Sequence, residues 1–149
     1  FYSDNRIFQE MIRELNLLRK HNISKKKKQT KLLLLAEGSL TLIALERFLR
    51  MFLNNYSSNN TLYNLLELSI KNGITINAIE NKKAIKSLTN IRNTIMHANY
   101  EQAIADIPYE TVEEYFKYEY IAEIEFIYNL LNNIVKQVDI NTGKLIIKE

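Results

Sequence analysis

The stretch "KLLLLAEGSLTLIALERFLRMFL", residues 31 to 53, decides the fold class of this chain. It is the most apolar run in the sequence, and its apolar residues recur at helical spacing. Four charged residues interrupt it: Glu37, Glu46, Arg47 and Arg50. That is too many charges for a membrane span, so the stretch predicts a long amphipathic helix, from about residue 30 to 56, with a buried face.

Two features of this predicted helix lead to further expectations. Gly38 lies in its interior, where glycine costs about 1 kcal/mol relative to alanine, so we expect a neighbouring element to pack closely there. The four charged residues either pair with one another or face a functional cleft, and we favour the pairing.

The rest of the composition agrees with a helical protein. The chain has 149 residues, of which 46% are hydrophobic, with three glycines, one proline and no cysteine. This length suits a single domain, and the scarcity of glycine and proline favours long helices over hairpins. The lack of cysteine excludes disulfides and thiolate zinc sites. No secretory or transit peptide is visible, so we expect a cytoplasmic protein.

Outward from the central stretch, the pattern predicts one all-α domain over residues 1–149, a compact bundle of about five helices. Ser3 is expected to cap the first helix, and Gly73 to take the left-handed position after the third. A turn is predicted at Thr142-Gly143, in a tail that forms a short strand or stays loose. The predicted helices span about residues 3–21, 30–56, 61–72, 81–98 and 109–138.

Charge is unevenly distributed along the chain. The net charge is +3, but residues 1–60 hold 11 Lys and Arg against 5 Asp and Glu, whereas the remainder holds 9 against 12. The densest basic run is Lys25, Lys26, Lys27 and Lys28. It is either a solvated loop between two helices or a contact for the phosphate backbone of RNA.

The fourth predicted helix has two unlike faces when its residues are placed about 100° apart. Its apolar arc comprises Ala84, Leu88, Ile91, Ile95 and Ala98. The opposite arc comprises Lys86, Asn90, Asn93 and His97. Arg92 lies at the edge between the two arcs. A polar arc of this kind is either the ordinary outer face of a bundle helix or a site of chemistry.

The chemistry that these residues suit is RNA cleavage. His97 lies one turn after Asn93, a spacing at which the amide can orient the imidazole, and the planar guanidinium of Arg92 can grip a phosphate. Acid–base cleavage needs one group to take a proton from the 2′-OH and another to give one to the leaving oxygen. A two-fold dimer would bring two copies of His97 and Arg92 to one cleft.

At these positions the sequence resembles the HEPN superfamily of small helical domains, many of which are ribonucleases. Their signature is an arginine, usually followed by a polar residue, and then a histidine after four to six intervening positions. Here it is Arg92-Asn93-Thr94-Ile95-Met96-His97, and the continuation "HANYEQA" is similar to a form seen in some members. In one toxin subgroup, a nucleotidyltransferase modifies a tyrosine two positions after the histidine. This chain departs from that pattern, because its tyrosine is Tyr100, three positions after.

The resemblance implies a homodimer with a composite active site that cleaves RNA without metal or cofactor and leaves a 2′,3′-cyclic phosphate. His97 would be the acid–base group, Arg92 would hold the scissile phosphate, and Asn93 would orient one of them. We expect further RNA contacts from Lys86, Asn90, Tyr100 and the lysine run at 25–28.

The family also suggests a bacterial toxin–antitoxin or anti-phage setting, with an antitoxin or inhibitor protein as partner and no membrane. The alternatives are a catalytically inactive HEPN domain that serves as an RNA-binding or dimerisation module, and a helical scaffold whose motif is a coincidence.

Overall fold

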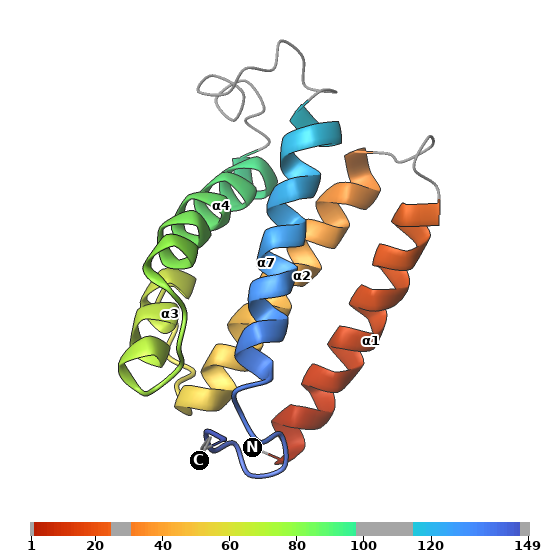
Figure 1. The fold of residues 1–149 in the computed structure, drawn as a ribbon. Helices are drawn as coiled ribbons and strands as arrows, with labels where there is room; N and C mark the ends of the chain where they lie inside the picture. The colour runs from red at the N-terminus through yellow and green to blue at the C-terminus, as the bar shows by residue number, and fades with distance from the viewer. Residues whose placement is uncertain (1, 25–30, 98–114, 147–149) are drawn as a thin grey trace.

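The computed structural model describes residues 2–24, 31–97 and 115–146, and these residues form a helical bundle (Figure 1). The elements are α1 (Tyr2–Ser24), α2 (Lys31–Leu53), α3 (Leu62–Lys71), α4 (Ala78–His97) and a π-helix η1 (Tyr115–Tyr120) that continues into α7 (Ile121–Val135). In these ranges the only strand-like pairing is an isolated bridge between Val138 and Leu145. The predicted all-α class is confirmed.

The apolar stretch that decides the fold is the central helix. α2 packs against α1, α3, α4 and α7. Figure 1 shows α7 lying across it, with α1 on one side and α3 and α4 on the other. Leu45, Phe48 and Leu49 of α2 are fully buried, and the ring of Phe48 lies 5.1 Å from that of Phe8 in α1. A helix surrounded in this way needs a wide apolar face, which the composition of the stretch provides.

Gly38 is a point of close approach to α2. A Cβ atom at this position would lie 2.9 Å from Cζ of Tyr120, closer still to the Tyr120 hydroxyl, and 3.5 Å from Cγ2 of Ile91. Both Tyr120 and Ile91 are fully buried. The expected close packing at Gly38 is therefore confirmed, and it brings together α2, η1 and α4.

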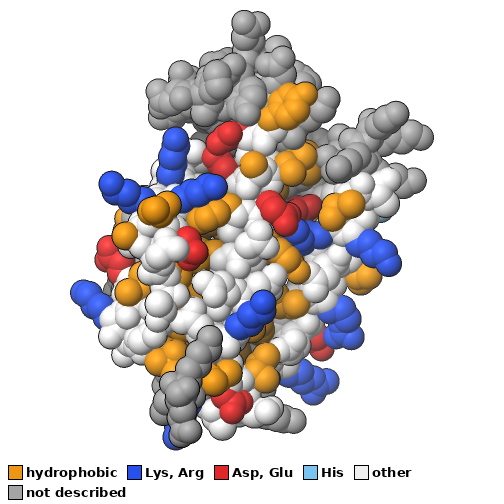
Figure 2. Space-filling model, in the orientation of Figure 1, with side chains coloured by type: hydrophobic (Ala, Val, Ile, Leu, Met, Phe, Trp, Pro, Cys, Tyr) orange, Lys and Arg blue, Asp and Glu red, His pale blue; other side chains and the backbone are white. Residues whose placement is uncertain are grey.

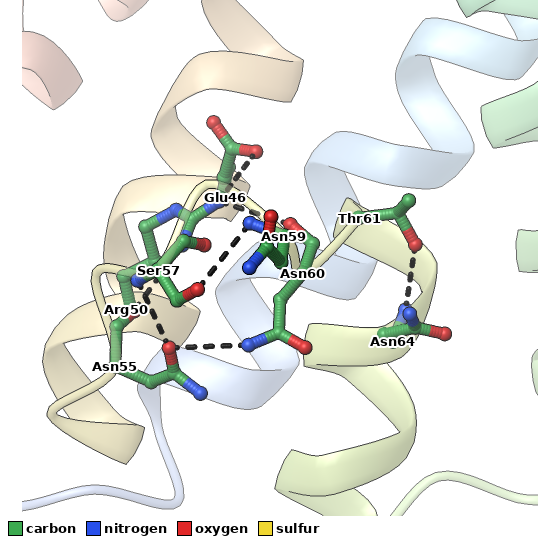
Figure 3. A network of polar contacts seen from close by, with 8 residues as sticks. All are labelled: Glu46, Arg50, Asn55, Ser57, Asn59, Asn60, Thr61 and Asn64. Atoms are coloured by element: carbon green, nitrogen blue, oxygen red, sulfur yellow. Dashed lines mark hydrogen bonds and ion pairs between the residues drawn. The ribbon is translucent and has the colours of Figure 1, made fainter.

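Arg50, near the end of α2, organises the link to α3 (Figure 3). Its guanidinium donates to the carbonyl oxygens of Asn55 at 3.3 Å, Ser57 at 2.9 Å and Asn60 at 3.1 Å. It also lies 3.4 Å from Glu46, one turn earlier. The favoured pairing of the charges within α2 is therefore confirmed for these two residues.

Glu37 does not follow that pairing. Its carboxylate contacts Arg19 of α1 at 3.1 Å instead of a charge on its own helix. Arg47 lies over the ring of Tyr56, with 5.8 Å between the guanidinium carbon and the ring centroid. The expectation of pairing within the stretch was therefore wrong for Glu37, which faces the neighbouring helix rather than the turn above or below.

Most predicted helix ends agree with the structure to within a few residues. α3 begins after Thr61, whose hydroxyl accepts the N–H of Asn64 at 3.2 Å (Figure 3), and Gly73 after it has φ of 111° as expected. The predicted turn in the tail is present, with Gly143 at φ of 74°. Ser3 is not a cap, because α1 already includes Tyr2.

The fifth helix differs from its prediction. It was expected over about 109–138, and the described part comprises η1 and α7, residues 115–135. Residues 109–114 lie outside the described ranges. The π-helical turn was not predicted; such turns widen a helix locally and often occur near functional sites.

No helix in the described parts of the chain is long and apolar enough to cross a membrane. The charges within α2 explain this for that helix.

Candidate functional site

The predicted motif falls in the last two turns of α4, which ends at His97. The backbone of Arg92, Asn93 and His97 is helical, but their side chains lie outside what the structure describes, so their roles stay predictions. The end of α4 lies at the same end of the bundle as η1 and the start of α2 (Figure 1). The predicted contacts at Lys25–Lys28 and Tyr100 lie outside the described residues.

The apolar arc of α4 is confirmed as far as it is described. Ala84, Leu88 and Ile91 are 0%, 6% and 0% exposed, and they face the bundle interior. Ser87 is buried between them at 4%. The side chains of the last two predicted members, Ile95 and Ala98, lie outside the described set.

Asn90, a member of the polar arc of α4, borders α7 instead of standing clear of the bundle. Asn90 is half-buried, and its Nδ2 donates to Oε1 of Glu123 in α7 at 2.9 Å. Lys83 lies nearby, with its Nζ 4.8 Å from the ring centroid of Phe126. Asn90 thus has a partner within the chain, while its predicted contact with RNA stays a prediction.

The outer side of α4 is basic. Figure 2 shows Lys and Arg side chains gathered over α4, with acidic side chains close by. α4 carries exposed Lys82, Lys83 and Lys86 on this part of its surface. A cluster of exposed lysines next to the motif is suited to the phosphate backbone of RNA, and the predicted role of Lys86 is untested.

Glu123 is the most unusual group near the motif, and sequence reasoning missed it. It is 6% exposed, and burial raises its pKa from 4.5 to about 8. The hydrogen bond from Asn90 opposes this rise, the nearby carboxylate of Glu119 adds to it, and the charge of Lys86 opposes it weakly. At neutral pH this carboxyl is therefore mostly protonated, held in the α4–α7 contact.

A sequence signal for Glu123 was present. The buried residues of α7 define one arc of the helix, and the position of Glu123 falls inside that arc. The other members of the arc are Ile124, Ile127, Leu130, Leu131 and Ile134. A glutamate at a core position of an otherwise apolar face marks either a buried ion pair or a protonated acid.

A second polar cluster joins α1, α2 and α7. The guanidinium of Arg19 contacts Glu37 at 3.1 Å and Glu125 at 2.6 Å, and it stacks on the ring of Tyr128, 3.7 Å from the centroid. Asn22 donates to the other oxygen of Glu37 at 2.9 Å. Because both terminal nitrogens of Arg19 are engaged, this cluster is best explained as a connection between three helices.

The described residues contain no group of three or more His, Cys, Asp or Glu side chains placed to hold a metal ion.

In comparisons with protein-family models, curated proteins and solved structures, the chain matches none of them. The likeness to HEPN domains therefore rests on the motif at residues 92–97 and on the helical architecture.

Proposed function

We propose that the chain is a metal-independent endoribonuclease that acts as a two-fold homodimer, with Arg92, Asn93 and His97 in the active site. The observation that carries the proposal is the Arg-Asn-x3-His motif in the last two turns of α4, within an all-α bundle. α4 is helical through His97, so Asn93 and His97 have the i, i+4 relation at which the amide can orient the imidazole.

The reaction would proceed through the RNA's own 2′-OH. The 2′ oxygen attacks the adjacent phosphorus, the bond from phosphorus to the 5′ oxygen breaks, and a 2′,3′-cyclic phosphate remains. The imidazole of one His97 takes the 2′-OH proton, and the protonated imidazole of the partner copy gives a proton to the 5′ oxygen. Arg92 binds the phosphate oxygens through its planar fork as negative charge develops on them.

The exposed lysines of α4 support this proposal, because they lie on the same helix as the motif and would attract RNA without selecting its sequence. A toxin–antitoxin or anti-phage setting, with an inhibitor protein as partner, belongs to the same proposal. The alternative is a non-catalytic RNA-binding or dimerisation module, since the lysines of α4 would serve binding equally well.

The test compares matched histidine variants. Purified wild-type protein is incubated with total RNA in EDTA beside His97→Ala and His21→Ala, since His21 is an exposed histidine on α1. We expect wild-type and His21→Ala to cleave RNA, and His97→Ala to lose about 10²–10⁴-fold or more, because one substitution removes both histidines of the dimer.

Three further measurements separate the mechanism from the alternative. The products should end in a 2′,3′-cyclic phosphate, and RNA with a 2′-deoxy sugar at the cut site should resist cleavage. Arg92→Lys should lose most activity, since an ammonium lacks the planar fork. Binding of RNA without cleavage by the wild-type protein would favour the binding module instead.

A further inference from the structure

A part-buried polar contact joins α4 to α7 near the motif. The carboxyl of Glu123, 6% exposed, accepts a hydrogen bond of 2.9 Å from the side chain of Asn90. A part-buried hydrogen bond of this kind constrains direction as well as distance. The contact therefore adds a directional constraint on the rotation of α4 to the one that its buried apolar residues supply.

The position of Asn90 on α4 links this contact to the motif. His97 lies seven residues further on, which is about two turns and about 10.5 Å along the helix, so both residues fall on one line of α4. Side-chain tips lie about 5–6 Å from a helix axis, and a rotation of about 10° moves them by about 1 Å. A displacement of that size can reduce catalysis about 10²-fold.

We propose that Glu123 is a positioning residue, which holds Asn90 through its buried carboxyl and thereby orients the segment of α4 that bears Arg92, Asn93 and His97. The predicted effect of Glu123 on the rate of RNA cleavage rests on the proposed ribonuclease function. Its predicted effect on the orientation of α4 does not.

The charge state of Glu123 supports this role. Its pKa is raised to about 8, chiefly by burial, so the neutral form prevails at pH 7. The charged groups that act on it are Glu119 of η1, which disfavours ionisation, and Lys86 of α4, which favours it. Ionisation would place a charge in a largely buried site beside a second carboxylate. Because the pKa is raised on balance, this cost exceeds the attraction of Asn90 and Lys86 for the ionised carboxylate, and the packing of α7 against α4 would weaken.

α2 packs against both helices, yet its charged groups are engaged elsewhere. Glu37 contacts Arg19, Glu46 contacts Arg50, and Arg47 lies over Tyr56. The orientation of α4 should therefore respond to pH through Glu123, with its partners on α4 and η1.

The experiment measures RNA cleavage at saturating substrate from pH 6 to pH 9.5 for the wild-type protein and for Glu123→Gln. The glutamine keeps the acceptor oxygen for Asn90 and stays neutral at every pH. The rate of the wild-type protein is divided by the rate of Glu123→Gln at each pH, so that effects common to both proteins cancel. We expect this ratio, normalised to its value at pH 6, to fall about tenfold between pH 7 and pH 9, because the neutral fraction of Glu123 falls from about nine-tenths to about one-tenth. Glu67→Gln, an exposed glutamate on α3, is the matched control and should give a flat ratio.

Amide hydrogen exchange tests the structural part without RNA. From pH 7 to pH 9, after correction for intrinsic exchange, protection of residues 91–97 should fall in the wild-type protein and hold in Glu123→Gln. α1, which lies apart from this contact, is the internal reference and should keep its protection. If Glu123→Gln fails to fold, residues 91–97 can still be compared with α1 within the wild-type protein.

The outcomes separate the two proposals. Loss of cleavage in His97→Ala with a flat rate ratio, and unchanged protection at pH 9, would overturn the role of Glu123 and leave the ribonuclease in place. A wild-type protein that cleaves no RNA but loses protection at residues 91–97 at pH 9 would overturn the ribonuclease proposal and leave the structural role of Glu123 in place.

Discussion

Glu37 and Glu123 are buried to a similar extent, 8% and 6% exposed, but their surroundings differ. Glu37 contacts the guanidinium of Arg19 and the amide of Asn22, where α1 meets α2. Glu123 contacts the amide of Asn90 and has the carboxylate of Glu119 nearby. A buried carboxyl needs either an opposite charge or its own proton. One side of the bundle is therefore joined by a charge pair, and the other by a protonated acid.

This difference predicts that the two contacts fail in different ways. The contact at Glu37 is sensitive to loss of its partner, because an unpaired buried charge is left behind. The contact at Glu123 is sensitive to pH, because its stability depends on a proton. The side of the bundle that responds to pH is the side that carries the predicted motif.

The largest expected effect is at the charge pair. Arg19→Met should lower the free energy of unfolding at pH 7 by about 3–5 kcal/mol, because it leaves Glu37 buried without its cation. Urea unfolding followed by circular dichroism measures this. Arg13→Met, an exposed arginine on the same helix, is the control and should change the value by about 0.5 kcal/mol or less.

A second substitution sharpens this result. Arg19→Met combined with Glu37→Leu should recover most of the lost stability, because an apolar pair of similar volume carries no desolvation cost. If the double variant is as unstable as the single one, the loss comes from packing against Tyr128 rather than from the charge of Glu37.

The next effect is the pH dependence at Glu123. Its pKa rises from 4.5 to about 8 on folding, so between these values the unfolded chain has released a proton that the folded chain still holds. The contribution of Glu123 to stability is thus complete below pH 4.5 and declines as the pH rises to about 8, by about 1.4 kcal/mol per pH unit.

Glu123→Gln should remove this decline, so the variant should gain stability on the wild-type protein as the pH rises from 5 to 8. Unfolding at several pH values measures the difference between the two curves. Parallel curves across this range would show that Glu123 titrates normally and that burial does not hold its proton.

The sequence predicted the helices and their buried faces but not the polar contacts between helices. The apolar stretch at 31–53 predicted a central helix, and the wheel of α4 predicted Ala84, Leu88 and Ile91 as core, since helical periodicity is a local property. It could not predict which side chains meet across helices. The pairing of Arg19 with Glu37 joins residues 18 apart, and the contact from Asn90 to Glu123 joins residues 33 apart. Both depend on how the helices pack.

The candidate site shows the same limit. A motif of six residues in one helix is visible in the sequence, whereas the polar arc of α4 was expected opposite the core because a single helix gives no information about its second neighbour. The structure places Glu123 of α7 against Asn90 of that arc, so Asn90 is half-buried.

A smaller effect is expected where α2, η1 and α4 meet. Gly38→Ala should lower stability by about 1–3 kcal/mol, because the new methyl group would clash with Tyr120 in a filled core, although alanine favours the helix by about 1 kcal/mol. Thermal unfolding measures this. Combining it with Tyr120→Phe should reduce the cost, since the hydroxyl is the closest atom. An equal cost in both backgrounds would place the strain at the ring of residue 120, whose Cζ lies 2.9 Å from the new Cβ, rather than at the hydroxyl.

The smallest effect concerns Lys86, which lies near both Glu123 and the predicted path of RNA. Its positive charge favours the ionised form of Glu123, so Lys86→Gln should raise the pKa of Glu123 further and move the upper end of the stability decline to higher pH. Lys82→Gln removes the same charge one turn away on α4, from a residue that does not act on Glu123, and should leave the upper end of the stability decline in place.

The same Lys86→Gln variant tests the contact with RNA. Loss of one phosphate contact should reduce the slope of log affinity against log salt concentration by about 0.7 for a single strand. The rate at saturating RNA should stay close to that of the wild-type protein at pH 6, where Glu123 is neutral in both. A shift in the pH curve without any change in the salt slope would assign Lys86 to the α4–α7 contact alone and remove it from the RNA path.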